Sequence, residues 1–342
     1  MDATAVTIGV DTHRDLNVAV ALGAQGQILG SLVVPSSLAG HARLLSWGHS
    51  LGKVERVGIE GTGSFGAGLC RYLSAAGLAV VEVDRPYRRG RRRAGKTDLI
   101  DAERAARAVL SGEARVQPKA GNAGVECIRL LSTARRGAVK ARTQAANQLH
   151  GLVTTAPDEL RAKLRELTIA QLVKRAARWR TTTADGPLAA ARLAIRTVAR
   201  RYRQLAREVS ELDAQLEVLV LRVAPALLAT PNVGCETASA LLVAAGDNPQ
   251  RLRSEAAFAH LCGVAPIPAS SGKTVRHRLS RLGDRQANRA LFLIVLGRMH
   301  RDERTRAYVA RRTTEGLSKA EIIRCLKRYV ARELFPLLPR AA

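Results

Sequence analysis

The chain has 342 residues, with 55 lysines and arginines against 29 acidic residues, a formal net charge of +26 and a pI near 11.2. This length allows two or three domains with real cores and excludes a small disulfide-stapled scaffold. The surplus of positive charge predicts a polyanionic partner, either nucleic acid or an anionic membrane surface. Aromatic residues make up only 3% of the chain, which favours phosphate contacts over base stacking.

The positive charge is unevenly distributed. Residues 1–84 contain five basic and seven acidic side chains, so the remaining residues carry +28. The five cysteines form no CxxC pair and no histidine stands at metal-ligand spacing, which argues against disulfides and a zinc site. No leader pattern begins the chain and no apolar run approaches the ~18 residues that span a bilayer. We therefore expect a soluble cytoplasmic protein.

The N-terminal region alternates short apolar strands with helices. Three β-branched segments come first, and a strand, a helix and a strand follow the first helix. This order predicts an α/β sheet with ligand chemistry at strand C-termini. The expected strands are 5–11, 17–23, 27–34, 54–60 and 78–84, and the expected helices are 38–51, 66–77 and 97–112.

Residues 120–225 are expected to be wholly helical. From Ile195 to Val223, apolar residues recur at steps of three and four over about four heptads, which is typical of a coiled coil. The coil could form between subunits or as a hairpin, and a long helix packed on its own domain is the alternative. The seam consists of Ile195, Val198, Tyr202, Leu205, Val209, Leu212, Leu216, Leu219 and Val223.

The C-terminal region opens with "TPNVGCETASALL", which resembles a helix-hairpin-helix that offers backbone N–H groups to phosphate. The turn places Asn232 where glycine is usual, and asparagine tolerates a positive φ. A polar basic loop and an apolar helix follow. The last helix is predicted to begin at Ser318 with a capping box to Glu321, and to end near Leu334.

Four carboxylates stand where they could converge on one sheet edge. Asp11 and Glu60 end two strands, while Asp98 and Asp101 share one face at the start of a helix. Alternatively, Asp98 is a helix N-cap and Asp101 a partner of the helix dipole. Clustered carboxylates repel one another unless a cation such as Mg²⁺ lies between them.

Two other motifs have competing interpretations. "GTGSFG", Gly61 to Gly66, fits the G-x-G-x-x-G of a Rossmann dinucleotide site, although Glu60 would set a carboxylate beside the pyrophosphate. "SSGKTVRHR" contains Ser270 and Ser271 among cations, and a serine there is either a nucleophile or part of a solvated phosphate-contacting loop.

Together these motifs closely resemble the IS110 family of insertion-sequence transposases and the related DNA invertases. The resemblance rests on "GVDTHR", "IEGTGSFG", "KTDLIDAERAARAVL" and "TPNVGCETASALLVAAGD" with the serine loop behind it, in that order over nearly the whole chain. The chain departs from the family pattern at Asn232 and in the single glycine of "SSGK".

The resemblance implies an RNase H-like (RuvC-like) α/β domain over 1–118, a helical coiled-coil dimerisation region over 119–224, and a mostly helical transposase domain over 225–342. It further implies a recombinase that cuts and rejoins DNA, guided by a structured bridge RNA, and that works as a dimer or as a tetramer on donor and target DNA. The implied catalytic set is Asp11, Glu60, Asp98 and Asp101, which bind two Mg²⁺ ions with Mn²⁺ as a substitute, and the nucleophile Ser271, with Ser270 as its rival.

Basic and backbone groups are expected to hold nucleic acid near these sites. They are Arg88, Arg89, Arg91, Arg92, Arg93, Lys96, Gly234, Lys273, Arg276, His277 and Arg278. Two alternatives stay open beside the serine recombinase: a RuvC-like metal-dependent nuclease or junction resolvase in which water attacks, and a Rossmann NAD-binding protein. A non-enzymatic nucleic-acid-binding protein is a third.

Overall fold

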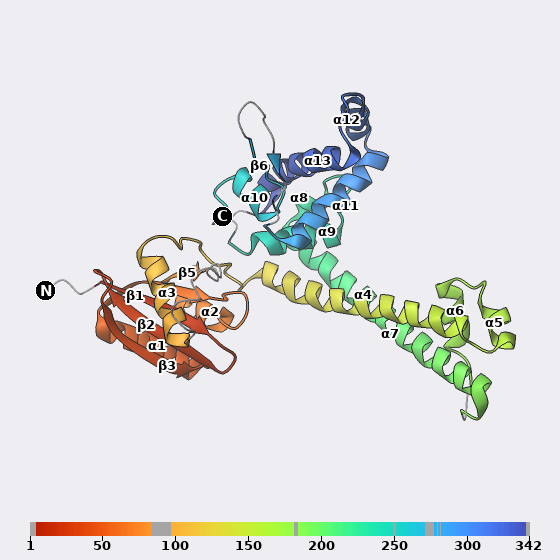
Figure 1. Cartoon of the computed structure of the whole chain (residues 1–342), viewed down its shortest axis with the longest axis horizontal. Coiled ribbons are helices and arrows are strands. Elements are labelled where there is room, and N and C mark those ends of the chain that lie inside the picture. The colour runs from red at the N-terminus through yellow and green to blue at the C-terminus, as the bar shows by residue number, and fades with distance from the viewer. Residues whose placement is uncertain are drawn as a thin grey trace. The chain divides into compact units, whose positions relative to one another are not determined.

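The computed structural model describes residues 5–83, 97–180, 184–248, 251–270, 277–278, 280 and 282–339. The chain forms two compact units (Figure 1). The first comprises residues 1–123, 245–253 and 340–342, and the second comprises 124–244 and 254–339. Among the described residues, every helix is too short or too polar to cross a membrane.

The first unit is built on a mixed five-stranded sheet in the order β3-β2-β1-β4-β5. Strands β1 to β3 pair antiparallel, whereas β1 pairs parallel with β4 and β4 with β5. This is the predicted RNase H-like arrangement. The Rossmann interpretation is wrong, because a dinucleotide-binding sheet is mostly parallel and lacks this antiparallel meander. The strands are β1 Ala5–Thr12, β2 Leu16–Gly23, β3 Ile28–Pro35, β4 Lys53–Glu60 and β5 Ala79–Val83.

Helices cover both faces of the sheet. On one face, α1 (Leu38–Leu51) and α2 (Ala67–Ala75) pack against alternate residues of β1 and β4. On the other face, α3 (Asp98–Leu110) packs on β1, β2 and β4. Because side chains alternate along a strand, Val6, Ile8 and Val10 lie in the core beneath α1 and α2, and the residues between them face α3.

Two glycines let α3 approach the sheet closely. A Cβ atom added to Gly9 would lie 2.1 Å from the backbone nitrogen of Ala106 and 2.2 Å from the carbonyl oxygen of Ala102. One added to Gly58 on β4 would lie 2.6 Å from Cγ2 of Val109. Only glycine fits at Gly9, since the atoms it would meet belong to backbone.

A segment from late in the sequence belongs to the first unit. Nδ2 of the buried Asn248 donates to the carbonyl oxygen of Pro118 at 2.9 Å, and its Oδ1 accepts from the backbone N–H of Ala120 at 3.0 Å. One amide side chain thus satisfies both a carbonyl and an N–H of the segment that precedes the second unit in the sequence.

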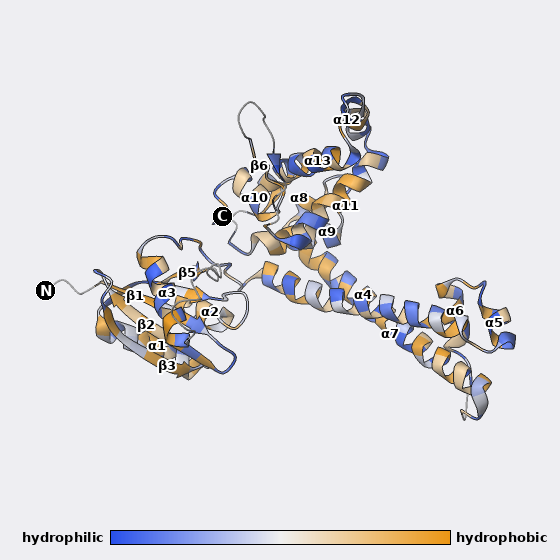
Figure 2. Cartoon of the chain, viewed as in Figure 1, coloured by the Kyte–Doolittle hydropathy of each residue, from blue (hydrophilic) through white to orange (hydrophobic). Residues whose placement is uncertain are grey.

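The second unit begins with a long antiparallel helical hairpin. Helix α4 (Gly124–Thr154) packs along α7 (Gly186–Val223), and the short helices α5 (Asp158–Leu164) and α6 (Ile169–Ala176) close its far end. Orange and blue residues alternate along α4 and α7 in Figure 2, as expected for helices that bury one face. The predicted heptad seam on α7 is buried or half-buried, and it packs against α4 of the same chain.

Short helices and a small ribbon make up the rest of this unit. The predicted hairpin turn lies between α8 and α9, and Asn232 adopts the expected positive φ of 62°. The capping box of Ser318 with Glu321 is confirmed at the start of α13. The elements are α8 Pro225–Leu228, α9 Cys235–Ala245, α10 Glu255–Leu261, β6 Ile267–Pro268, β7 His277–Arg278, α11 Arg285–Arg301, α12 Glu303–Thr314, α13 Lys319–Leu334 and η3 Phe335–Leu337.

Replacing Gly9 with alanine should destabilise the first unit. The new methyl group would overlap backbone atoms that cannot rotate away, so we expect a loss of about 3 kcal/mol, at the upper end of overpacking costs. Thermal unfolding of Gly9→Ala, followed by circular dichroism, measures this effect. Gly68→Ala on α2 is the matched control, because its Cβ would meet only Cε1 of His41 at 3.5 Å; an equal loss in both variants would contradict the close-approach argument.

Candidate functional site

The close approach of α3 places the predicted acids at one edge of the sheet. Asp11 lies two residues beyond Gly9 on β1, and Glu60 lies two residues beyond Gly58 on the neighbouring β4. Since residues two apart share a strand face, both acids stand on the side covered by α3. Asp98 and Asp101 occupy the first turn of α3, and Asp101 is buried with 6% of its surface exposed.

Asp11, His13 and Asp98 form a group that could hold a metal ion. One ligand atom from each lies within 4.8 Å of the other two. Nε2 of His13 lies 3.2 Å from Oδ2 of Asp11 and 3.4 Å from Oδ1 of Asp98. The imidazole therefore lies between two carboxylates from different elements. Together the three side chains offer an ion one nitrogen and two oxygen ligands.

His13 was not among the site residues predicted from the sequence. The signal was present in "GVDTHR", because His13 follows Asp11 by two residues near the end of β1 and can point to the same side. Histidine is a common metal ligand, and a carboxylate beside it fixes its ring orientation. The Asp-x-His spacing could have suggested the pair.

Electrostatics at Asp11 reflect the crowding of acids. Burial raises the pKa of Asp11, the neighbouring His13 lowers it, and the nearby charges of Asp101 and Asp98 raise it further. Each of these raising effects disfavours the ionised carboxylate, and a bound cation would offset them. The three predicted aspartates thus lie close enough to influence one another.

The charge of Asp101 acts on Asp11, but neither Asp101 nor Glu60 belongs to the metal-binding group that the described residues form. Oγ1 of Thr12 donates to the backbone carbonyl of Glu60 at 2.8 Å and so ties the end of β1 to the end of β4. Asp101 accepts from Nη1 of Arg104 at 3.4 Å. The alternative of Asp98 as an N-cap is wrong, because Thr97 caps α3 by accepting from the N–H of Ile100.

The predicted serine loop lies in the sequence between the two strands of the β6–β7 ribbon. Ile267 pairs with Arg278 and Pro268 with His277, so residues 269–276 connect two paired strands. His277 and Arg278, which follow this loop in the sequence, are exposed. Ser271, Lys273 and Arg276 lie outside the described residues, as do Arg88, Arg89, Arg91, Arg92, Arg93 and Lys96.

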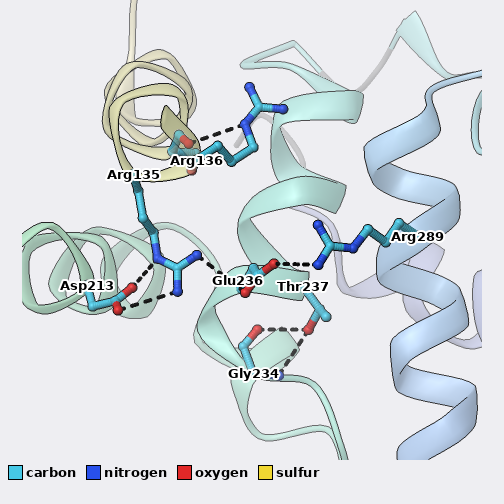
Figure 3. Close-up of polar contacts among 8 residues, drawn as sticks. Arg135, Arg136, Asp213, Gly234, Glu236, Thr237 and Arg289 are labelled. Atoms are coloured by element: carbon cyan, nitrogen blue, oxygen red, sulfur yellow. Dashed lines mark hydrogen bonds and ion pairs between the residues drawn. The ribbon is translucent and has the colours of Figure 1, made fainter. Parts of the chain in front are cut away.

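Ion pairs link the first turn of α9, the second helix of the helix-hairpin-helix, to neighbouring helices (Figure 3). Arg135 on α4 contacts Asp213 on α7 and reaches Glu236 on α9 at 3.3 Å, while Arg289 on α11 lies 3.8 Å from the same glutamate. The hydrogen bond to Asp213 and the nearby acids raise the pKa of Arg135. The contacts to Glu236 hold the helix-hairpin-helix against α4 and α11.

The turn itself remains open toward solvent at Gly234. The backbone N–H of Gly234 donates to Oγ1 of Thr237 at 3.0 Å, and that hydroxyl donates to the Gly234 carbonyl at 2.9 Å. A Cβ atom on Gly234 would meet no atom within 4 Å. The expected phosphate contact at Gly234 stays a prediction.

Both halves of the chain match known protein families. A model described as transposase, of the DEDD type, matches residues 8–156, and a model described as transposase of the IS116/IS110/IS902 family matches residues 224–310. The first match contains the four predicted acids and His13. The second contains the helix-hairpin-helix and the predicted serine loop.

Two proteins of bacterial insertion elements are similar to this chain. The IS900 uncharacterized 42 kDa protein of Mycobacterium paratuberculosis is 28% identical over 280 residues, covering 68% of this chain and 69% of the relative. The IS110 uncharacterized 43.6 kDa protein of Streptomyces coelicolor is 33% identical over 130 residues, which is 37% of this chain and about a third (32%) of the relative's length. With both family models matched in order, this chain belongs to the IS116/IS110/IS902 family of transposases.

Proposed function

We propose that this protein cuts and rejoins DNA by serine attack on a phosphodiester, with metal ions held by the acids at the edge of the sheet. The observation that carries the proposal is the grouping of Asp11, His13 and Asp98 in a chain whose two halves match transposase families. In this proposal, residues 1–118 form the metal site, residues 119–224 form the dimer, and residues 225–342 supply the serine.

In this proposal, metal binding and nucleophilic attack belong to different residues of the chain. Asp11, Glu60, Asp98 and Asp101 would hold Mg²⁺, with Mn²⁺ as a substitute and two ions as the expected number. His13 would add a nitrogen ligand beside Asp11 and Asp98. When bound, the metal neutralises charge on the phosphate that is attacked. Ser271 is the nucleophile we assign from the family motif, and Ser270 is its rival.

Serine attack explains how strands can be exchanged without ATP. The bond from Oγ to phosphorus forms as the bond from phosphorus to one sugar oxygen breaks, and that oxygen takes up a proton. A hydroxyl of the new strand then reverses the step, restoring the serine and making the new phosphodiester. The covalent phosphoserine conserves the bond energy between the two steps.

The partners we propose are donor DNA, target DNA and an RNA encoded by the element. The +28 charge beyond residue 84 suits phosphate backbones of either nucleic acid. Guidance by RNA would assign sequence recognition to base pairing and leave the protein to hold backbones, which agrees with the scarcity of aromatic residues.

Binding of metal ions should raise the thermal stability of the protein. We expect MnCl₂ to raise the melting temperature more than MgCl₂, because imidazole favours transition metals over magnesium. Asp98→Asn should abolish both shifts, while His13→Gln should bring the manganese shift down to the magnesium shift. Differential scanning fluorimetry with EDTA-treated protein measures this, and Asp158→Asn, an exposed acid on α5, is the control. Unchanged shifts in Asp98→Asn would contradict the metal assignment.

Ser271→Ala should bind DNA but form no covalent adduct with it. The test incubates the protein with MgCl₂ and radiolabelled DNA carrying the element's ends, together with RNA transcribed from the flanking non-coding segment. Denaturing gel electrophoresis then detects protein joined to DNA. Ser270→Ala should retain the adduct. An adduct in Ser271→Ala, or cleavage without any adduct in the wild type, would favour Ser270 or a water-based nuclease respectively.

Exposed apolar residues on the hairpin support a dimer. Leu130 on α4 and Val218 and Leu221 on α7 are 55%, 55% and 57% exposed, and the antiparallel pairing brings Leu130 near the level of the other two. A second copy would remove these side chains from water.

The Val218→Asp/Leu221→Asp double variant should therefore dissociate the dimer, because each new charge would be buried at the contact. Light scattering coupled to size-exclusion chromatography measures the mass. The exposed residue Leu282, which is 80% exposed on another part of the unit, provides Leu282→Asp as the control. A double variant with the same mass as the wild type would exclude this surface as the dimer contact.

A further inference from the structure

A basic cavity lies at the base of the β6–β7 ribbon. Its volume is about 490 Å³, and its walls come from the turn before β6, from Arg278 on β7, and from Arg324 and Lys327 on α13. The lining residues Pro266 and His277 stand on either side, in the sequence, of the loop 269–276 that we expect to bear the nucleophile.

Lys327 is a half-buried cation with a neutral partner. Its Nζ donates to Oδ1 of Asn288 at 2.9 Å, and Nδ2 of Asn288 in turn donates to the carbonyl oxygens of Cys262 at 2.9 Å and Gly263 at 3.1 Å. Within the described ranges, no carboxylate lies within 4.0 Å of Nζ. Burial lowers the pKa of Lys327, and the charge of Arg324 lowers it further.

The next residue on the same helix shows the contrast. Arg328 is held by Glu255, whose Oε2 accepts from Nη2 at 2.7 Å, and Arg332 donates to the same carboxylate at 3.0 Å. The hydrogen bonds from Arg328 lower the pKa of Glu255 to about 2. The charge of Arg328 is thus matched inside the fold, and that of Lys327 is not.

The other cations of the cavity are weakly compensated. Arg324 lies 3.7 Å from Glu321, and both side chains are largely exposed, so water screens the pair. Oε2 of Glu321 also accepts from the backbone N–H of Ser318 at 2.9 Å. Arg278 is exposed and makes no ion pair with another described residue. Lys327 is the half-buried cation of the three, and a charge partly removed from water is costly without an opposite charge. Glu321 is the one carboxylate among the described residues that line the cavity, so its cations outnumber its acids and favour an anion.

We propose that Lys327, Arg324 and Arg278 bind a backbone phosphate of the DNA strand that the serine attacks, a few nucleotides from the attacked phosphodiester. Lysine binds phosphate as a point charge, and the arginines add directed N–H donors. The identity of the strand rests on the proposed function, whereas the binding of phosphate rests on the cavity alone. Lys327 is a positioning residue in this scheme.

Lys327→Met should weaken binding of a fluorescein-labelled single-stranded oligodeoxynucleotide about tenfold, the usual scale for one charged hydrogen bond. It should also reduce the slope of log affinity against log NaCl by about 1, which is the effect of losing one phosphate contact. Lys327→Arg should retain the slope. Fluorescence anisotropy with the full-length protein measures both quantities.

Lys319→Met removes the same charge from the exposed start of the same helix and is the matched control. It should leave affinity and slope at wild-type values. An equal loss in both variants would overturn the proposal, since it would reveal a diffuse effect of net charge. So would wild-type binding by Lys327→Met. An oligoribonucleotide of the same sequence distinguishes the strands, because a loss confined to RNA would overturn the assignment to DNA.

A measurement on the wild type covers the case in which Lys327→Met does not fold. Acetic anhydride labels lysines, and mass spectrometry reads each site with and without the oligodeoxynucleotide. Protection of Lys327 without protection of Lys319 supports the proposal, and equal labelling of Lys327 in both samples overturns it. Neither assay involves cleavage, so a failure of the serine mechanism in the adduct experiment leaves these results unaffected and distinguishable.

Discussion

The contact between α3 and the sheet is the constraint on which the candidate metal site depends. Gly9 and Gly58 let the helix backbone lie directly on β1 and β4, and this fixes where the first turn of α3 stands. A side chain at either glycine would lift the helix and separate Asp98 from Asp11. Close packing on the glycines thus brings the carboxylates together although acids repel one another, and His13 lies between Asp11 and Asp98.

The sequence predicted the parts of this arrangement better than their contacts. Alternating strands and helices indicated the α/β sheet, and family resemblance indicated the RNase H-like order, which the strand pairing confirms. The i, i+3 spacing predicted that Asp98 and Asp101 share a helix face. What it could not supply was the distance between separate elements, so His13 was missed even though it lies in the same motif as Asp11.

The heptad seam shows another limit of sequence reasoning. A repeat of apolar residues indicates that a helix packs against another helix. It does not indicate which one, because a second copy or another helix of the same chain can bury the seam equally well. Here α4 fills that role for α7. The sequence of α4 shows a weaker pattern with many alanines, which is why the hairpin remained one of several possibilities. Lys327 gave no sequence signal, because its neutral partner Asn288 lies 39 residues away.

The hydrogen bonds of Asn248 limit how the chain can be divided into fragments that fold. The chain leaves the first unit after residue 123, builds the hairpin and returns to the first unit at 245 before completing the second. No single cut therefore yields two intact pieces, because a fragment ending before residue 245 leaves the Pro118 carbonyl and the Ala120 N–H without the amide that satisfies them. An exchange of one unit for that of another protein meets the same limit, because the two units are interleaved in the sequence. Each unit can therefore be exchanged only together with the partners of these two hydrogen bonds.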